Sequence, residues 1–243
     1  MTTFSRDAEL TPAYILHTRK YRDTSLLADF ITEKEGRVTA VIRGARGGKK
    51  KTGVVQPFTP LLVSYIGRGD LKTVTKLDAG NFDPLSGESL LVGFYVNELL
   101  VRLLGKFEPV PVLFHAYQAL LLDLVSAGVS APSLRIFELT LLRQLGYGIT
   151  FGIDAMSGEP VKPGCYYRYV PDEGFHELVH DTENASYKGE NLLAISNGDL
   201  SIPEVDSCAK KIIQVSFAVL LGGKPLKSRE LFEMYHSGTK QKN

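Results

Sequence analysis

The segment GRVTAVIR, residues 36–43, decides the first half of the fold. Side chains of an extended chain point to opposite faces in turn, so alternate residues share a face. One face takes Val38, Ala40 and Ile42, and the other takes Arg37, Thr39, Val41 and Arg43. This alternation predicts a β-strand with one apolar face and one face that carries both arginines.

Four further segments with strand character surround it between Ala13 and Ala79. Each is bounded by Gly, Pro, Asp-Thr or a Glu-Lys-Glu-Gly turn, which are signals for the ends of strands. The segments are AYILHTRKYR (13–22), TSLLADFIT (24–32), PFTPLLVSYIG (57–67) and LKTVTKLDAG (71–80). Five short strands in under 80 residues predict a small barrel. A five-stranded barrel that binds polyanions favours the oligonucleotide-binding (OB) fold.

After Asp83-Pro84 the spacing of apolar residues changes to that of helices. Five helices are expected, at 89–107, 110–128, 132–146, 204–223 and 228–235. Between residues 147 and 202 the pattern weakens into turns, which indicates an irregular or small β insertion. We therefore expect an α+β protein, with an OB-fold domain at 1–80 and a mainly helical domain at 81–243 that contains the insertion.

The formal net charge of +1 conceals an uneven distribution. Residues 1–80 hold fourteen Lys and Arg against eight Asp and Glu, whereas residues 81–243 hold fourteen against nineteen. This asymmetry favours a polyanion as the partner of the first part. Cys165 and Cys208 are too few for a disulfide framework. The first residues are polar and no run of about 18 apolar residues occurs, so we expect a cytoplasmic protein with neither a signal peptide nor a membrane partner.

The segment RGARGGKKKTG, residues 43–53, carries five cations and four glycines without an acid. Glycines favour a mobile backbone that approaches a ligand closely, which predicts a loop that grips phosphate. The phosphate loop of nucleotide hydrolases is excluded, because three residues instead of four separate Gly44 from Gly48-Lys49, and Lys50 takes the place of the required hydroxyl. The alternative is a solvated loop whose charge only keeps the protein soluble.

Positive charge extends beyond this loop, since residues 43–76 contain eight cations and one acid, Asp70. We expect DNA contacts from Arg37, Arg43, Arg46, Lys49, Lys50, Lys51, Arg68 and Lys72. Phe58 and Tyr65 lie where aromatic rings could stack on bases, and the alternative is that both are core residues. A different function is also open, that of an adaptor whose barrel binds an acidic protein tail instead of DNA.

Three segments together resemble one bacterial family. They are GRVTAVIRGAR with the QPFTPLLVSY that follows, RIFELTLLRQLGYG, and GGKPLKSRELF. From about Ala13 to Phe232 the chain resembles the RecO recombination and repair mediators, particularly their gammaproteobacterial form. The resemblance implies an OB domain, a helical domain, no catalytic centre and a place at the nucleoid. It also implies binding of single- and double-stranded DNA, strand annealing, contact with the C-terminal tail of single-stranded-DNA-binding protein (SSB), and action with RecR to load RecA.

Many members of this family carry a four-cysteine zinc site after the LGYG helix, and this chain departs from that pattern. The corresponding stretch is DAMSG, residues 154–158, with Asp and Ser in place of thiolates. Cys165, His176 and His180 lie nearby, but one thiolate at these spacings makes a weak tetrahedral set. We therefore expect no metal and no cofactor, and an insertion held by packing of Tyr166, Tyr167, Tyr169 and Phe175.

The expected helix at 133–145 has two distinct faces at a step of about 100° per residue. The stripe predicted to face the core contains Leu134, Phe137, Leu141 and Leu145. The second stripe contains Arg135, Leu139, Leu142 and Arg143. The resemblance implies that this stripe binds the SSB tail, a short acidic peptide ending in a phenylalanine carboxylate that Arg135 would hold. The alternative is a surface ion pair between Arg135 and Glu138 at i,i+3.

A second basic group lies near the end of the chain. Lys224, Lys227 and Arg229 surround an expected helix start, where free backbone amides favour a phosphate. Lys210 and Lys211 lie on the helix before it. All five are candidates for a secondary contact with DNA or with a protein tail. The plainer alternative is that Ser228 caps the last helix and that these cations are only solvated.

Overall fold

The structure is a computed structural model that describes residues 9–46, 55–179 and 186–240 of the 243-residue chain. The chain divides into two compact units. The first, which we call the barrel unit, comprises residues 1–128 and 226–243, and the second, the helical unit, comprises residues 129–225. The sequence predicted a domain boundary at residue 80, where strands give way to helices. The two compact units have a different boundary, because each of them contains some of the helices.

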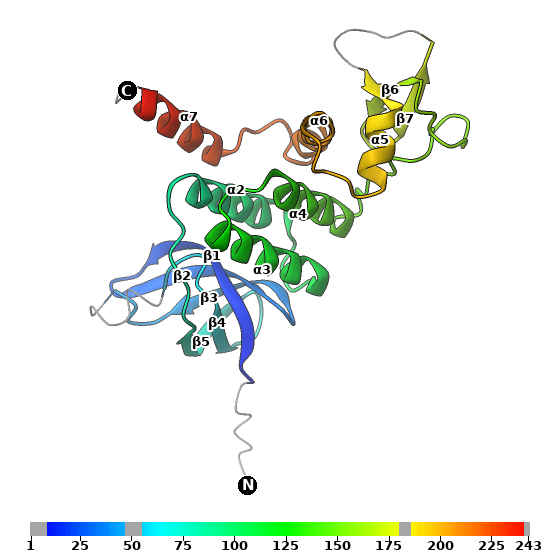
Figure 1. The fold of residues 1–243 in the computed structure, drawn as a ribbon. Helices are drawn as coiled ribbons and strands as arrows, with labels where there is room; N and C mark the ends of the chain where they lie inside the picture. The colour runs from blue at the N-terminus through cyan, green and yellow to red at the C-terminus, as the bar shows by residue number, and fades with distance from the viewer. Residues whose placement is uncertain (1–8, 47–54, 180–185, 241–243) are drawn as a thin grey trace. The chain divides into compact units, whose positions relative to one another are not determined.

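Five strands close into a barrel in the barrel unit (Figure 1). They are β1 (Thr11–Tyr21), β2 (Ser25–Thr32), β3 (Gly36–Ile42), β4 (Leu61–Ile66) and β5 (Leu71–Ala79). The order around the barrel is β1-β2-β3-β5-β4. The β3–β5 pair is parallel, and the other pairs are antiparallel. Five strands closed in this way form the OB fold, so the predicted α+β class with an OB barrel is confirmed.

Apolar side chains that alternate along the strands fill the barrel. The core cluster contains Ala13, Ile15, Ala28, Phe30, Ala40, Ile42, Ala45, Val55, Leu61 and Val63. The predicted apolar face of β3 contributes Ala40 and Ile42 to this cluster. Thr39 and Val41 on the opposite face are also buried, at 5% and 8% exposure. The outer face of β3 is therefore covered at these two positions; Arg37 on the same face is partly exposed, and Arg43 is exposed just beyond the end of the strand.

A buried asparagine joins three elements of the barrel unit. Asn97 lies on α2 (Gly87–Leu103), and its Nδ2 donates to the Leu16 carbonyl of β1 at 2.9 Å. Its Oδ1 accepts from the Tyr117 hydroxyl of α3 (Pro111–Ser126) at 2.7 Å. Both side chains are buried, where an unpaired polar group would be costly. This chain of hydrogen bonds therefore fixes α2 and α3 against the barrel.

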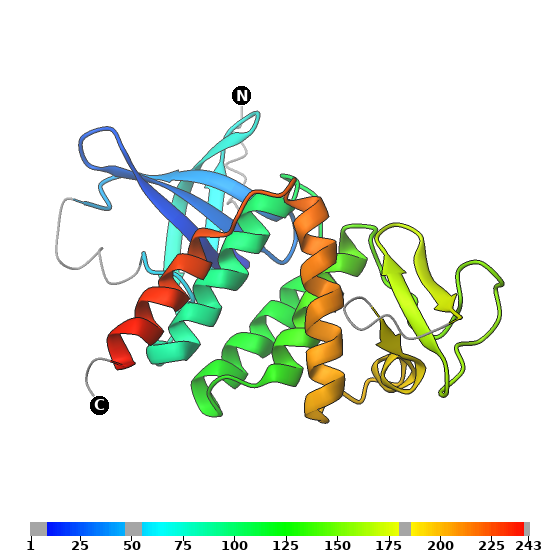
Figure 2. The same cartoon turned by 90° about the horizontal axis from the view of Figure 1, so that it is seen from above.

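The last helix, α7 (Lys227–Lys240), packs along α2 (Figure 2). Its first amides are held by Glu98 of α2, whose Oε1 accepts from the Lys227 amide at 2.9 Å and whose Oε2 accepts from the Ser228 amide at 2.8 Å. A carboxylate at a helix N-terminus is favourable because of the helix dipole. The C-terminal helix thus belongs to the barrel unit.

The described residues of the helical unit form three helices and a small sheet. The helices are α4 (Ala131–Gln144), α5 (Gly189–Ser196) and α6 (Pro203–Leu220), and α6 packs against both others. The sheet has the order β7-β6-β8, with β6 (Tyr166–Val170), β7 (Gly174–Leu178) and β8 (Tyr187–Lys188). The sheet and α5 fall within residues 147–202, where a small β insertion was predicted.

Aromatic packing holds this insertion, in agreement with the sequence. Tyr167 and Phe175 are fully buried. The Phe175 ring lies 5.5 Å from the Phe151 ring and 5.1 Å from the Tyr169 ring, centroid to centroid. The Tyr169 hydroxyl is also hydrogen-bonded to the Ser216 hydroxyl of α6 at 2.8 Å. The sheet is therefore anchored to the helices of its own unit.

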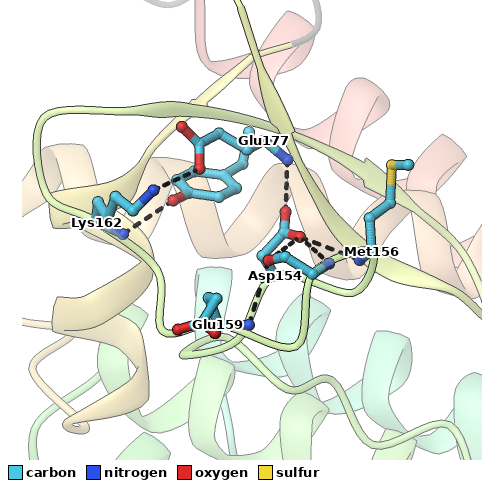
Figure 3. Close-up of polar contacts among 7 residues, drawn as sticks. Asp154, Met156, Glu159, Lys162 and Glu177 are labelled. Atoms are coloured by element: carbon cyan, nitrogen blue, oxygen red, sulfur yellow. Dashed lines mark hydrogen bonds and ion pairs between the residues drawn. The ribbon is translucent and has the colours of Figure 1, made fainter.

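A buried carboxylate organises the turn at 154–158 (Figure 3). Asp154 Oδ1 accepts from the amides of Met156 and Ser157 at 3.1 and 2.7 Å, and from the Ser157 hydroxyl at 2.8 Å. Its Oδ2 accepts from the Glu177 amide of β7 at 2.7 Å. Burial would raise the pKa of Asp154, but these hydrogen bonds, led by those from Ser157, lower it. Hydrogen bonds thus join this turn to the sheet.

Candidate nucleic-acid interface

Cations gather where β1 turns into β2 and where β3 ends. Lys20 on β1 pairs in register with Leu26 of β2, and Leu26 pairs with Ile42, the last residue of β3. We call the cations around this point, Lys20, Arg22, Arg43 and Arg46, the hairpin end; all four are exposed. Strand pairing therefore brings cations from both ends of the 20–46 segment to one place.

The hairpin end is fixed through backbone atoms. The Arg46 amide donates to the Thr24 carbonyl at 3.0 Å, and the Arg46 Nη1 donates to the Arg22 carbonyl at 3.4 Å. These bonds hold the turn after β3 against the β1–β2 turn. Within the described part of the chain, Arg43 and Arg46 form no ion pair. Their charges are therefore available to an external anion.

The three consecutive lysines predicted to contact DNA lie outside the described residues. Lys49, Lys50 and Lys51 fall in residues 47–54. The prediction for them therefore rests on the sequence alone.

Two more predicted cations lie on and beside the β4–β5 turn. Arg68 in this turn is exposed. Lys72 on β5 is half-buried; its Nζ donates to the Gly67 carbonyl at 3.1 Å and lies 4.8 Å from the centre of the Phe107 ring. Neither forms an ion pair with a described residue. In OB folds this turn is one of the loops that bind nucleic acid.

Arg37 lies on the outer face of β3 but is only partly exposed, with 17% of its side chain accessible. Its Nη1 lies 3.9 Å from Asp29 Oδ1. Arg37 lines a pocket together with Arg19 and Lys106, and the sequence analysis did not indicate these two residues as binding candidates. Arg19 was detectable from the alternation of the expected strand 13–22, because residues 17 and 19 share a face. Lys106 had no local signal, since it is distant in sequence from every barrel strand.

The two aromatic residues considered for base stacking, Phe58 and Tyr65, differ in burial. Phe58 is 5% exposed, and its ring lies 5.5 Å from that of Phe94 on α2. Tyr65 is half-buried against the barrel core and donates to Glu35 Oε2 at 2.9 Å. The alternative that these are core residues is therefore confirmed for Phe58, whereas Tyr65 packs against the barrel core and is only half-buried.

Arg135 on α4 is buried between two carboxylates. Its Nε donates to Asp206 Oδ1 at 3.1 Å, and its Nη1 contacts Glu138 Oε2. Burial alone would lower the pKa of the guanidinium, but Glu138 and Asp206 outweigh it and raise that pKa. The ion pair expected between Arg135 and Glu138 is thus present, but it is buried instead of lying on the surface.

The other residues of the predicted tail-binding stripe do not share one accessible face. Leu142 is fully buried, Leu139 is half-buried, and Arg143 is exposed. The buried residues of α4 are Arg135, Phe137, Glu138, Leu141 and Leu142, whereas Leu134 and Leu145 are only half-buried. The buried face of this helix is therefore turned from the predicted one toward Arg135 and Leu142.

The cations of the secondary basic group are exposed, but the first amides of α7 already donate to Glu98. Lys210, Lys211, Lys224, Lys227 and Arg229 all have exposed side chains. The amides of residues 227 and 228, considered as a phosphate site, are taken by Glu98. Burial would raise the pKa of Glu98, but these two amides and Arg102 lower it. The cap of α7 therefore comes from α2.

Metal and membrane features were searched over residues 9–46, 55–179 and 186–240. In these ranges no group of three or more His, Cys, Asp or Glu side chains is arranged to hold a metal ion. The same ranges contain no helix with the length and apolar character needed to cross a bilayer.

A closed five-stranded barrel with exposed basic side chains at its turns defines an OB-fold protein. Two family models, described as Recombination protein O N terminal and Recombination protein O C terminal, match residues 8–81 and 84–230. The chain belongs to the RecO family, and the resemblance found in its sequence is confirmed.

Curated relatives support this membership over most of the chain. The DNA repair protein RecO of Haemophilus influenzae is 43% identical over 228 residues, which are 93% of this chain and 96% of that protein. The proteins of the same name from Actinobacillus succinogenes and Pseudomonas paraeruginosa are 45% and 43% identical, and each match covers 90% of this chain. These matches cover 93% and 92% of those two proteins. Membership assigns the chain a general role in DNA repair.

Proposed function

We propose that this protein is a recombination mediator that binds single- and double-stranded DNA and does not catalyse a reaction. The contacts come from the hairpin-end arginines Arg43 and Arg46, from the lysines at 49–51, and from Arg37, Arg68 and Lys72. One observation carries the proposal: Arg43 and Arg46 are exposed and without an ion pair among described residues, and Arg46 is anchored to the carbonyls of Thr24 and Arg22. Phosphate contacts position a strand without reading its sequence, so binding is largely sequence-independent.

Strand annealing follows from the same chemistry. Cations that replace the counterions of two strands reduce their repulsion, and contacts with phosphates leave the base edges free to pair. Membership in a DNA repair family supports the proposed partners, which are the SSB tail, RecR and, indirectly, RecA. Such a protein would act in the cytoplasm, at the nucleoid.

The SSB tail is proposed to dock on α4. The exposed Arg143 and the half-buried Leu139, four residues apart on α4, offer a cation beside an apolar side chain. Leu142 of the same stripe is fully buried. Arg135 would hold the terminal carboxylate only after it releases Asp206. A peptide with an acidic sequence and a C-terminal Phe should therefore bind more weakly to Arg143→Ala. An Asp206→Asn variant should bind the peptide at least as well as the unmodified protein. Equal binding by all three proteins would refute this site.

The decisive experiment on DNA binding is its dependence on salt. With about five cation–phosphate contacts on a single strand, log affinity should fall with log salt at a slope of roughly −3.5. Replacing Arg43 and Arg46 by Gln should reduce the slope to about −2, because each contact contributes about −0.7. Lys34→Gln is the control, since Lys34 is an exposed barrel cation already paired with Glu9. An unchanged slope in the double variant would contradict the proposal.

The same variants test the adaptor alternative. An adaptor would keep its DNA behaviour in the Arg43/Arg46 variant and lose an acidic protein partner. Absence of catalysis is tested separately: DNA incubated with the protein and Mg²⁺ should remain uncut, and cleavage would overturn that part of the proposal.

A further inference from the structure

We propose that a pocket on the outer face of β1, β2 and β3 binds a single phosphate group. We call it the Arg37 pocket. It has a volume of about 330 Å³ and is lined by His17, Arg19, Asp29, Arg37, Thr39, Val101 and Lys106. The inference deepens the proposed DNA-binding function and rests on it, because it assigns one phosphate of the bound nucleic acid to a defined set of side chains.

Strand register builds the floor of the pocket. His17 of β1 is paired with Asp29 of β2, and Asp29 is paired with Thr39 of β3. Arg19 of β1 and Arg37 of β3 each lie two residues from this row, on opposite sides of it, because Arg19 is paired with Leu27 of β2 and Arg37 with Ile31. Side chains two residues apart on a strand share a face, so both arginines lie on the face of this row. The barrel therefore presents two arginines to one pocket from strands that are not neighbours.

The third cation is Lys106, which lies in the segment after α2, and backbone contacts join this segment to β3. The Phe107 amide donates to the Arg37 carbonyl at 3.0 Å, and Lys106 forms a parallel bridge with Arg37. Gly36 allows this approach, because a Cβ at its position would lie 1.8 Å from the Glu108 carbonyl oxygen. Lys106 is thus held at the pocket by backbone contacts.

The charges in the pocket favour an anion. Three cations face one carboxylate, Asp29, whose Oδ1 accepts from the Thr39 hydroxyl at 2.6 Å. Arg19 and Lys106 form no ion pair with any residue in the described ranges. The carboxylate therefore neutralises at most one of the three cations, and a surplus of positive charge remains.

Arg37 is the most informative member of the set. Its side chain is mostly buried, yet its Nε has no hydrogen-bond partner within the described chain, and its nearest ion-pair contact to Asp29 is long, at 3.9 Å. Buried donors are almost always paired, because an unpaired one is costly. A small rotation of the guanidinium would let Nε and an Nη donate together to two phosphate oxygens, the geometry that arginine favours.

The lining also indicates which part of a nucleotide fits. Val101 is the one purely aliphatic side chain among the seven lining residues, and the one aromatic ring is the imidazole of His17, with no Phe, Tyr or Trp to give a base a broad stacking face. The pocket therefore suits a charged group and not a base. A phosphodiester within a strand, a 5′-terminal phosphate and inorganic phosphate share this chemistry.

The first test uses inorganic phosphate as the probe. The Nε–Hε signal of Arg37 in ¹⁵N-edited NMR spectra should move saturably when phosphate is added to the full-length protein. It should not move with chloride at the same ionic strength, and it should respond more weakly in the Arg19→Gln/Lys106→Gln variant. Both substituted residues are exposed, so the variant should keep its fold, which its thermal unfolding checks. An equal response to chloride, or none to phosphate, would overturn the proposal.

The second test uses a short single strand with either a 5′-phosphate or a 5′-hydroxyl. The Arg19→Gln/Lys106→Gln variant should bind about tenfold more weakly than the unmodified protein, with a salt slope shallower by about 1.4 if both contacts are lost. Lys34→Gln should bind normally. A loss seen only with the 5′-phosphate assigns the pocket to a strand end, and an equal loss with both assigns it to an internal phosphate.

The outcomes separate the pocket from the proposed function. If Arg43→Gln/Arg46→Gln weakens DNA binding but Arg19→Gln/Lys106→Gln changes neither affinity nor slope, the pocket proposal is wrong and the function stands. If the unmodified protein binds no DNA while Arg37 still responds to phosphate, the function is wrong and the pocket is a site for a small phosphate.

Discussion

The turn at 154–158 offers a sharp test, because a single carboxylate, that of Asp154, accepts four hydrogen bonds that hold it. The perturbation is Asp154→Asn, which keeps the size of the side chain but replaces one acceptor oxygen by an NH₂ group. Three donors meet Oδ1 and one, the Glu177 amide, meets Oδ2. Whichever way the Asn side chain is turned, its NH₂ faces at least one N–H donor.

The magnitude follows from the better of the two orientations. With the NH₂ at the Oδ2 position, the variant loses the bond from the Glu177 amide and leaves that donor unpaired. A lost hydrogen bond to a charged group together with an unpaired donor costs about 2 kcal/mol. Asp154→Ala loses every acceptor and should cost about 4 kcal/mol. Ser157→Ala removes the hydroxyl that donates to Asp154 and accepts from the exposed Glu159 amide, and should cost about 1 kcal/mol.

Two measurements on the full chain check this order. Urea unfolding gives the free energy of unfolding, and hydrogen exchange over residues 150–179 locates the loss in the insertion. We expect faster exchange around Met156 and Glu177 in both Asp154 variants, with little change in the barrel strands. If Asp154→Asn lies within about 0.5 kcal/mol of the unmodified protein, the carboxylate does not hold this turn.

The pKa of Asp154 gives the same prediction a pH dependence. The hydrogen bonds lower this pKa in the folded state. The stabilisation is therefore fully present above the ordinary aspartate pKa of about 3.9 and is lost as pH falls through the lower folded value. Below about pH 4 the free energy of unfolding should decrease more steeply in the unmodified protein than in Asp154→Asn. Parallel curves would contradict the assignment.

Three further predictions concern other buried contacts. Gly36→Ala should lower the free energy of unfolding in urea by about 3 kcal/mol or more, because the new Cβ would meet a backbone carbonyl at a residue with positive φ. Gly44→Ala is the control. Gly44 has a similar φ of 65° but no described atom within 4 Å of the added Cβ, so this substitution should cost only about 1 kcal/mol. Glu98→Gln should lower the free energy of unfolding by about 1 kcal/mol and speed hydrogen exchange in the first turn of α7. Arg135→Met should cost about 3–5 kcal/mol because it removes the buried guanidinium that both Asp206 and Glu138 contact, whereas Arg143→Ala should stay within about 0.5 kcal/mol.

The barrel was predictable because its signals are local. The alternation in residues 36–43 and the turn residues between the five segments involve only a few neighbouring positions. The five barrel strands lie at the predicted segments. The aromatic core of the insertion was predictable for the same reason, since Tyr167 and Phe175 lie in short segments with strand character. What the sequence did not indicate is which helices pack with the barrel.

The orientation of α4 was predicted incorrectly because its partner is remote. The amphipathic pattern alone favours Leu134 and Leu145 as core residues. Asp206 of α6, 71 residues from Arg135, supplies a carboxylate that makes burial of the guanidinium acceptable. The Arg37 pocket has the same character, since Lys106 reaches it only through the close approach at Gly36. Such sites depend on pairings between distant segments, which periodicity does not report.

The arginines of this chain differ physically in a way that separates stability from binding. Arg135 is enclosed by two carboxylates and is screened little by salt, whereas Arg43 and Arg46 are exposed and their field falls off within about 10 Å at 0.1 M salt. Raising the salt concentration should therefore weaken a phosphate contact at the hairpin end while leaving the Arg135 contacts nearly intact. A loss of DNA binding at moderate salt would then report weakened phosphate contacts and not unfolding, because the helical unit would keep its fold under the same conditions.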